Sequence, residues 1–343
     1  MLKNNVADIK PFFSIIIATY NSENTLEYTL ESIKRQDIDK NDLEIIVVDG
    51  GSTDSTINIA NKYGAKIINN PQKLPEFAKA IGEKVAIGHY IVRMDSDEEL
   101  TYKQQLSDKK RFYEENPKCK VLLSSLYVLG RKEIVGVSSQ YMNIYGDPFS
   151  RFMYRTRGDK YETYRKYIEE EHDGYAVMKY TARDILPLAD SGTCSYSLDY
   201  VRTHYNDELG SIAFTCSAFD RIITDTGYYG CIKRDKIRHN CSSSLKTYLK
   251  KLKFRVINNI SYKNEGGFSS YKMERNKSRI MMFCLYALCV PVPICDSIYL
   301  AIKHKDCTML LHVFYLYYVC VQIAISYLKK LLKINERPKS YGK

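Results

Sequence analysis

Apolar runs alternate with helical patterns through the first hundred residues of this 343-residue chain. The runs at 12–18, 44–48, 66–69 and 90–94 are short and contain many Ile and Val residues, as buried strands do. Segments with apolar residues at helical spacing separate these runs. The alternation predicts an α/β fold with a mostly parallel, Rossmann-like sheet and helices on both faces. In such sheets, ligands bind at the carboxyl ends of the strands.

The fourth apolar run ends in two aspartates, Asp95 and Asp97, which are separated only by Ser96. Residues two apart in an extended segment point to the same side, so we expect these carboxylates to converge on one point. Carboxylate oxygens are the ligands that Mg²⁺ and Mn²⁺ prefer. The motif therefore indicates a divalent cation that carries a phosphorylated substrate. An Asp-rich turn that caps the following helix is the alternative, and the motif alone does not separate the two.

Charge and cysteine content limit the partners and the compartment. The formal net charge is +11, so we expect an anionic partner. The surplus is concentrated after about residue 230, beside long apolar segments, and no nucleic-acid recognition motif is present. A membrane surface is therefore favoured over nucleic acid. The ten cysteines include no Cys-x-x-Cys pair and residues 1–10 lack an apolar signal region, so we expect no zinc site and a cytosolic catalytic part.

Two apolar segments near the carboxyl terminus, 280–302 and 309–328, are each close to the length of about 20 residues that spans a bilayer. Basic residues flank the pair on both sides, and the connector between the segments is short. This pattern predicts a membrane-associated helical hairpin with both ends in the cytosol. The alternatives are two buried helices of a soluble domain, or a re-entrant pair kinked at Pro291 and Pro293.

Three motifs follow one another in the amino-terminal part, at 14–21 (SIIIATYN), 45–56 (IIVVDGGSTDST) and 90–97 (YIVRMDSD). Their order and spacing resemble the family 2 glycosyltransferases, which have the nucleotide-sugar-binding GT-A fold. The resemblance is strongest over 12–100 and extends to about residue 260. It implies an inverting transfer from a UDP- or GDP-sugar that depends on Mn²⁺ or Mg²⁺.

The resemblance also implies residue roles. The nucleotide-sugar site would be formed by Thr19, Tyr20, Asn21, Glu23, Asp49, Gly50, Asp95 and Ser96. The metal ligands would be Asp95, Asp97 and His239, with Asp97 as the direct carboxylate ligand. Gly50 would let the backbone approach the nucleotide without a Cβ collision.

The general base is where the chain departs from the family pattern. Family members carry a carboxylate about one helix length before a Gly-Tyr pair, which is Gly227-Tyr228 here, but the expected positions 214–217 read Phe-Thr-Cys-Ser. We expect Asp220, on the same predicted helix, to act as the base. Asp190, in the turn Asp-Ser-Gly-Thr, is the second candidate.

These patterns predict a glycosyltransferase domain over 1–262 and a membrane-associated part over 263–343. The domain would comprise a nucleotide-binding half (12–100), an acceptor half (101–242) and a basic interfacial helix (243–262). We expect sugar transfer to a glycan or lipid-linked acceptor at the cytosolic membrane face. A transferase acting on polyprenyl phosphate itself, and a non-catalytic nucleotide-binding scaffold, are the alternatives. The absence of tryptophan disfavours the processive synthases of the family, whose chain-holding motif requires it.

Overall fold

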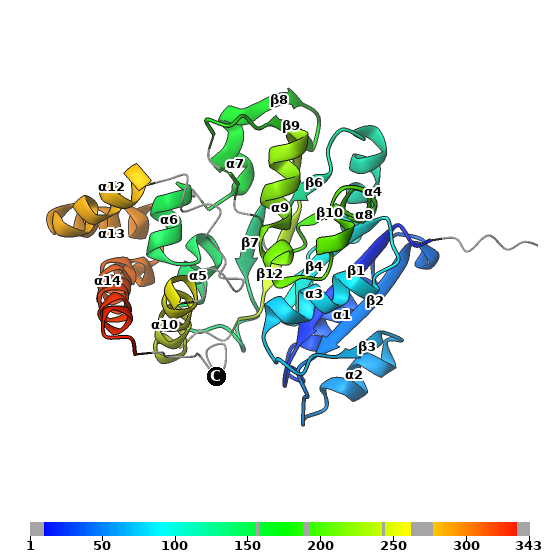
Figure 1. The fold of residues 1–343 in the computed structure, drawn as a ribbon, viewed down its shortest axis with the longest axis horizontal. Helices are drawn as coiled ribbons and strands as arrows, with labels where there is room; N and C mark the ends of the chain where they lie inside the picture. The colour runs from blue at the N-terminus through cyan, green and yellow to red at the C-terminus, as the bar shows by residue number, and fades with distance from the viewer. Residues whose placement is uncertain are drawn as a thin grey trace, which may run out of the picture.

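The computed structural model describes residues 10–155, 158–184, 186–187, 189, 192–241, 244–261 and 277–334. Its centre is a nine-stranded sheet, and a three-stranded sheet lies beside the strand that ends in Asp95 (Figure 1). The large sheet has the order β3 (Lys66–Asn69), β2 (Leu43–Asp49), β1 (Phe13–Thr19), β4 (Tyr90–Asp95), β10 (Ser195–Ser197), β6 (Val121–Leu123), β11 (Tyr228–Ile232), β9 (Tyr175–Lys179) and β8 (Ile168–Glu171). The small sheet has the order β5 (Glu98–Leu100), β12 (Lys236–His239) and β7 (Leu126–Leu129).

Helices cover both faces of the large sheet, which confirms the predicted fold class. The helices before the carboxyl-terminal part are α1 (Leu26–Lys34), α2 (Thr56–Lys62), α3 (Pro75–Val85), α4 (Gln105–Glu115), α5 (Ser139–Tyr145), α6 (Pro148–Tyr154), α7 (Lys160–Tyr164), α8 (Leu198–His204), α9 (Ile212–Thr226) and α10 (Leu245–Ser261). Alternate residues of β1 point to opposite faces. Ile16 packs in a core with α3, α7, α8 and α9, whereas Ile15 and Ile17 pack in a second core with α1, α2 and α4.

The first four strands of the sheet, β3, β2, β1 and β4, are all parallel. Their carboxyl ends therefore meet at one edge, as the sequence pattern predicts. Strand β10 then pairs antiparallel with β4, so the parallel arrangement ends there.

Two continuous segments of the chain are each divided between the two sheets. The segment 120–128 forms β6 in the large sheet and β7 in the small one, and the segment 228–239 forms β11 and β12 in the same way. Both segments cross between the sheets at the same place, where the Ser125 N–H donates to the Asp235 carbonyl over 2.8 Å. The small sheet brings the end of β12 next to the end of β4.

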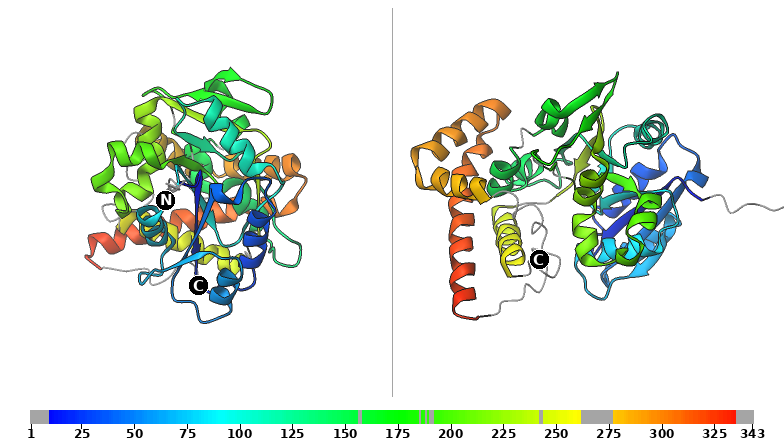
Figure 2. Two further views of the ribbon diagram at one scale, coloured as in Figure 1. Left: turned by 90° about the vertical axis from the view of Figure 1, so that its right-hand side faces the viewer. Right: turned by 45° about the horizontal axis from the view of Figure 1, so that its top comes forward.

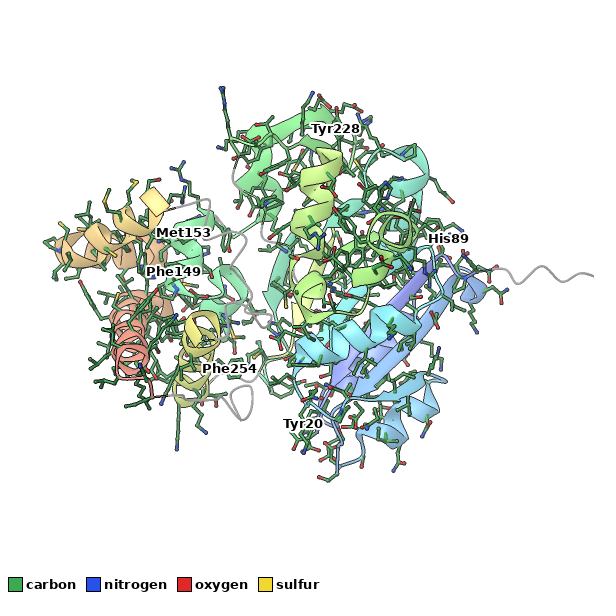
Figure 3. The ribbon with its side chains drawn as sticks, in the orientation of Figure 1. Tyr20, His89, Phe149, Met153, Tyr228 and Phe254 are labelled. Atoms are coloured by element: carbon green, nitrogen blue, oxygen red, sulfur yellow. The ribbon has the colours of Figure 1, made fainter. Side chains whose placement is uncertain are left out.

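The carboxyl-terminal helices α12 (Lys277–Leu288), α13 (Pro291–His304) and α14 (Leu311–Leu331) form a separate layer beside α5, α6 and α10 (Figures 1 and 2). A third core joins this layer to the rest of the protein through Tyr141 and Tyr145 of α5, Tyr248 and Leu252 of α10, and Tyr315 of α14. Phe149 and Met153 of α6 also lie beside this layer (Figure 3).

The first arm of the expected hairpin is bent. Helices α12 and α13 meet at an angle of 91° because Pro291, at the start of α13, has no N–H with which to continue α12. Within the part of the chain that the structure describes, one segment, Cys307–Leu331, is long and apolar enough to cross a membrane by composition, and the bent pair passes the same test only if it counts as one segment. The predicted boundary at residue 262 and the basic tail beyond residue 334 lie outside the described residues.

Candidate functional site

Two loops at the carboxyl edge of the sheet, after β1 and after β2, are tied together by hydrogen bonds. Tyr20 lies at this edge, whereas His89 lies at the opposite edge (Figure 3). The Asn21 N–H donates to Ser52 Oγ over 2.8 Å, and Asn21 Oδ1 accepts from the Thr53 N–H over 2.9 Å. Asn21 has a φ of 48°, a left-handed conformation that Asn tolerates better than most residues. The loop after β1 is therefore held in one shape before any ligand binds.

Glu23 and Asp54 strengthen the same connection. Glu23 Oε2 accepts from the Ser55 N–H over 3.0 Å, and the Glu23 N–H donates to Asp54 Oδ2 over 3.2 Å. Asp54 also accepts from the Thr56 N–H at the start of α2, which lowers the pKa of Asp54 although burial opposes that shift. The side chain of Glu23 thus contributes to the loop structure.

Asp49, at the end of β2, is occupied by hydrogen bonds within the protein. Its carboxylate accepts from Thr19 Oγ1 (3.0 Å), from the N–H groups of Gly51 and Ser52 (2.8 Å each) and from Ser52 Oγ (2.6 Å). A carboxylate has about four acceptor positions, so these four donors fill them. A direct bond from a nucleotide to Asp49 requires one of these donors to be displaced.

Gly50 follows Asp49 where the two loops approach each other closely. A Cβ atom at this position would lie 3.2 Å from the Tyr20 ring and 3.3 Å from the Lys73 Cα. The Lys73 ammonium lies 5.4 Å from the centre of the Tyr20 ring, within the range of a cation–π contact. The glycine therefore permits the packing that presents Tyr20 at the edge of the sheet.

Asp95 and Asp97 do not lie in one extended segment, which corrects the geometric argument from sequence. Strand β4 ends at Asp95, residues 96–97 form a turn, and β5 begins at Glu98. Asp95 Oδ1 lies 3.1 Å from Lys79 Nζ of α3, and the Asp95 N–H donates to Glu98 Oε2 over 2.9 Å. Ser96 Oγ lies 2.8 Å from Ser22 Oγ, which connects the turn to the loop after β1.

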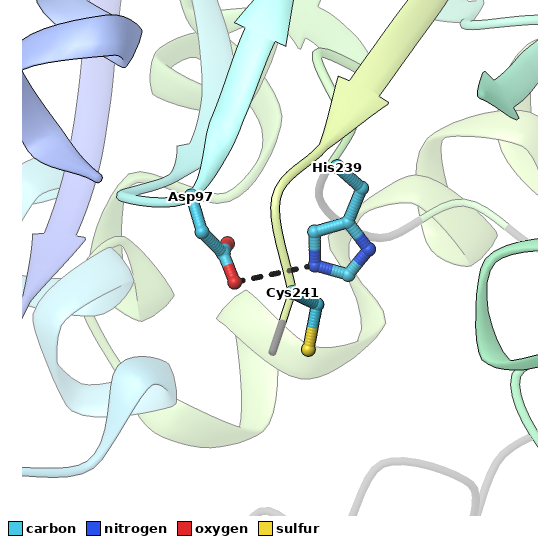
Figure 4. Close-up of side chains that lie close together, drawn as sticks. All are labelled: Asp97, His239 and Cys241. Atoms are coloured by element: carbon cyan, nitrogen blue, oxygen red, sulfur yellow. Dashed lines mark ion pairs between the residues drawn. The ribbon is translucent and has the colours of Figure 1, made fainter. Parts of the chain in front are cut away.

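Asp97 instead lies against the end of β12, in a cluster with His239 and Cys241 (Figure 4). Asp97 Oδ2 is 3.4 Å from His239 Nε2, and the ligand atoms of the three side chains all lie within 4.8 Å of one another. The register of the small sheet explains this approach, because His239 pairs with Glu98, the residue after Asp97. The Asn240 N–H also donates to the Asp97 carbonyl over 2.7 Å.

Electrostatic interactions favour the charged form of Asp97. Burial opposes ionisation, but the attraction and hydrogen bond of His239, followed by the charge of Lys251, lower the pKa of Asp97 to about 2. For His239, burial opposes protonation, while Asp97 and Glu98 raise the pKa. His239 Nδ1 lies 2.8 Å from Asn143 Oδ1, which assigns the proton to Nδ1 and leaves Nε2 facing Asp97.

The cluster fits a divalent cation. Adjacent ligands of an octahedral ion with bonds of about 2.1 Å are about 3 Å apart, which is close to the separation between Asp97 and His239. Carboxylate oxygen and imidazole nitrogen suit Mn²⁺, and a hydrogen bond to the far ring nitrogen orients such a ligand. Cys241 adds a softer sulfur ligand, which accepts a hydrogen bond from Lys251 Nζ over 2.8 Å. Asp95, the third predicted ligand, is not part of this cluster.

Sequence reasoning missed Cys241, Asn143, Lys79 and Glu76. The alternation of an extended segment predicts that Cys241 shares a side with His239, and that signal was available. Asn143 and Lys79 lie in helices whose placement depends on tertiary packing. Glu76, in the first turn of α3, lies close enough to Lys79 and Asp95 for their charges to interact, and burial raises its pKa.

The structure describes only one of the two predicted general bases. Asp220 lies in α9 with 5% of its surface exposed, and Asp190 lies outside the described residues. Cys216 interacts electrostatically with Glu76 and Lys79 of α3. Asp220 follows Cys216 by one helical turn, so the two residues lie on the same face of α9, which is directed toward α3.

A buried ion pair holds the start of α9 against the sheet. Arg93 Nε donates to Glu83 Oε1 over 2.9 Å, and Arg93 Nη2 donates to the Thr215 carbonyl over 2.8 Å. Thr215 Oγ1 completes the arrangement by donating to Glu83 Oε2 over 2.6 Å. Thr215, one of the four positions 214–217 where the family pattern leads us to expect a carboxylate, is thus held inside the protein by this ion pair.

Open α/β sheets bind their ligands, nucleotides among them, at the carboxyl edge, where this protein gathers its carboxylates and a histidine. The family model described as "Glycosyl transferase family 2" matches residues 14–186, just over half of the chain. The chain belongs to this family, which confirms the resemblance seen in its motifs.

Curated relatives match parts of the chain. Poly(ribitol-phosphate) beta-N-acetylglucosaminyltransferase TarS of Staphylococcus aureus is 34% identical over 125 residues, which cover 35% of this chain and 22% of that protein. UDP-Glc:alpha-D-GlcNAc-diphosphoundecaprenol beta-1,3-glucosyltransferase WfaP of Escherichia coli is 44% identical over 89 residues, which cover 25% of this chain and 35% of that protein. Both matches span much less than two thirds of the relatives.

A solved structure supports the fold. The mannosyltransferase PcManGT from Pyrobaculum calidifontis, in complex with GDP-Man and Mn²⁺, superposes with a TM-score of 0.52 over 92% of this chain and 87% of that one. The identity is 13%, so this similarity concerns the fold alone.

Proposed function

We propose that this protein is an inverting glycosyltransferase that moves a sugar from a nucleoside-diphosphate sugar to a glycan or lipid-linked acceptor. The observation that carries the proposal is the cluster of Asp97 and His239 beside the loops that follow β1 and β2. Asp97 and His239 would hold Mn²⁺ or Mg²⁺, with Cys241 as a further ligand. When bound, the ion supplies positive charge that stabilises the diphosphate leaving group.

The donor would lie across the carboxyl edge of the sheet. Thr19, Tyr20 and Asn21 would line the pocket for the nucleobase and ribose, and Gly50 would let the backbone approach the nucleotide without a Cβ collision. Asp95, supported by Lys79 over 3.1 Å, would face the ribose and the first phosphate together with Ser96. Glu23 and Asp49 would act mainly by holding these loops, because their carboxylates already accept hydrogen bonds there.

An inverting transfer needs a general base for the acceptor hydroxyl. Asp220 is our first candidate, and Asp190 stays the second. The structure adds Glu76, whose raised pKa and position near Asp95 suit proton transfer. The lack of a carboxylate at positions 214–217 is the observation that favours the alternative function, a nucleotide-binding scaffold without turnover.

The acceptor is proposed to be linked to a lipid at the cytosolic membrane face. The names of both relatives describe acceptors that carry phosphate, and the name of WfaP includes a polyprenyl carrier. Nineteen of the twenty-four exposed large hydrophobic side chains among the described residues lie between Met281 and Ile334. Such a concentration of exposed apolar surface marks an interaction site, and a bilayer fits its extent.

The packing of α10 favours a position in the plane of the membrane over a spanning one. Helices α10 and α14 lie side by side (Figure 2), and the rings of Tyr248 and Tyr315 are 4.8 Å apart. Exposed lysines of α10, at positions 246, 250 and 253, would enter the hydrocarbon core if α14 crossed it. Each lysine at that depth costs about 3 kcal/mol. We therefore expect α12, α13 and α14 to dock on one leaflet.

Hydrolysis of nucleotide sugars tests the proposal without an acceptor. Purified protein is incubated with UDP- and GDP-sugars, with and without Mn²⁺, and the released nucleotide is measured. We expect Mn²⁺-dependent release, its loss in Asp97→Ala, and its retention in Asp199→Ala. The control removes a carboxylate that also contacts a histidine, His89, over 2.5 Å at the opposite edge of the sheet.

The outcomes separate the alternatives. Wild-type release by Asp97→Ala would contradict the metal role. Binding of nucleotide without release from any donor would favour the scaffold. Addition of polyprenyl phosphate or of a glycan-lipid to the same assay distinguishes a polyprenyl-phosphate transferase from one that extends a glycan.

A further inference from the structure

A cavity of about 730 Å³ lies where the carboxyl-terminal helices meet α5, α6 and α7. It is separate from the edge of the sheet that carries Asp97. Its lining includes the cations Arg151, Arg155, Arg279 and Lys303 and the carboxylates Asp159 and Glu162. The lining therefore carries more positive than negative charge, with four cationic and two anionic side chains.

The two carboxylates of the lining are engaged with neighbouring groups. Asp159 accepts from the Tyr161 N–H over 2.7 Å and from Ser125 Oγ over 3.0 Å, so it caps α7. Glu162 lies 3.8 Å from Arg165 on the surface of α7. Neither carboxylate pairs with an arginine of the cavity.

Arg155 and Arg279 form the centre of positive charge. No carboxylate of the described residues pairs with either guanidinium, and their charges repel each other. Arg279 Nε is buried without a partner among the described residues, while its Nη2 donates to the Phe152 carbonyl. Arg151 differs because it makes a two-bond ion pair with Asp296. Unpaired guanidinium groups in a concave site match the geometry of phosphate oxygens.

The cavity continues into the exposed apolar surface. Met282 and Tyr299 line it and are 52% and 56% exposed, so they belong both to the cavity and to the surface proposed to meet the membrane. A molecule with a phosphate group and a hydrocarbon chain fits this combination, with its phosphate in the cavity and its chain along α12 and α13.

Helix α5 links the cavity to the candidate metal site. Asn143 contacts His239, whereas Tyr145, two residues later, lines the cavity. Residues two apart face opposite sides of a helix whose diameter is about 10 Å, so a short glycan attached to a phosphate in the cavity can extend toward the sheet edge. We propose that the cavity binds the phosphate of an isoprenoid-linked acceptor, an inference that rests on the proposed function.

Binding of farnesyl diphosphate, a soluble isoprenoid diphosphate, tests this assignment on the full chain. Calorimetry compares it with pyrophosphate and with farnesol for the wild type and for the double variant Arg155→Gln/Arg279→Gln. We expect the wild type to bind farnesyl diphosphate more tightly than either fragment, and the double variant to bind it at least about tenfold more weakly. The matched control is Arg35→Gln/Arg183→Gln, which removes two exposed arginines elsewhere and should bind as the wild type does.

Binding of UDP with Mn²⁺ is measured on the same samples. Its retention in the double variant shows that the protein is folded, and its absence from the wild type would contradict the proposed function rather than the cavity. Equal binding of farnesyl diphosphate by the wild type and the double variant would overturn the cavity assignment. Pyrophosphate binding as tight as that of farnesyl diphosphate would overturn the isoprenoid part.

Discussion

Replacement of Asn143 tests whether His239 is held in place as a metal ligand. Asn143 is 6% exposed, and its Oδ1 lies 2.8 Å from His239 Nδ1. Asn143→Ala leaves this ring nitrogen without its partner, a loss of about 1–3 kcal/mol in a buried setting. Loss of such an orienting partner weakens metal binding by about 10- to 100-fold, which equals about 1.4–2.8 kcal/mol. We therefore expect the dissociation constant for Mn²⁺ in the presence of UDP to rise by that factor.

Electron paramagnetic resonance measures this change, because free hexa-aquo Mn²⁺ gives a strong signal that decreases when the ion binds. The control is Asn116→Ala, since Asn116 is equally buried but donates to the Phe112 carbonyl in α4, away from the cluster. Asn143→Asp restores an acceptor for Nδ1 and should recover much of the affinity. Unchanged Mn²⁺ affinity in a folded Asn143→Ala protein would refute the reasoning.

Three further predictions concern the base, the sulfur ligand and the buried ion pair. Transfer should fall by about 10²-fold or more in whichever of Asp220→Asn and Glu76→Gln removes the base, with UDP binding unchanged. Wild-type transfer activity in both variants would exclude both residues as the base. Co²⁺ bound to the wild type should show a sulfur-to-cobalt charge-transfer band in the near ultraviolet that Cys241→Ser lacks, and a wild type without the band would exclude the sulfur as a ligand. Glu83→Gln should lower the free energy of unfolding in urea by about 3–5 kcal/mol, because it leaves a buried charge unpaired, whereas Glu27→Gln in an exposed pair should have a much smaller effect. Equal effects of these two substitutions would contradict the importance of burial.

The sequence predicts the strand edge well because local patterns determine it. The strands that end at Thr19, Asp49 and Asp95 begin and end within one or two residues of the predicted runs. Parallel pairing then brings their carboxyl ends together without further information. This is why Tyr20 and Asp49 could be assigned to one site.

The remaining parts depend on contacts between distant segments. The residues of β12 do not reveal which sheet the strand joins. The position of His239 next to Asp97 follows only from the pairing of β12 with β5. Likewise, Asn143 reaches His239 because α5 packs beside the small sheet. The hydrogen bonds that Asp49 accepts from Gly51 and Ser52 of its own loop could not be predicted either, because the sequence pattern is the same for a carboxylate that binds a ligand and for one that binds its own backbone.

Anomalous diffraction at the manganese edge, from crystals grown with UDP and Mn²⁺, locates the ion directly. A peak within bonding distance of both Asp97 and His239, with diphosphate oxygens as further ligands, is the result we predict. A peak elsewhere, or bound UDP without an ion between these two side chains, would contradict it.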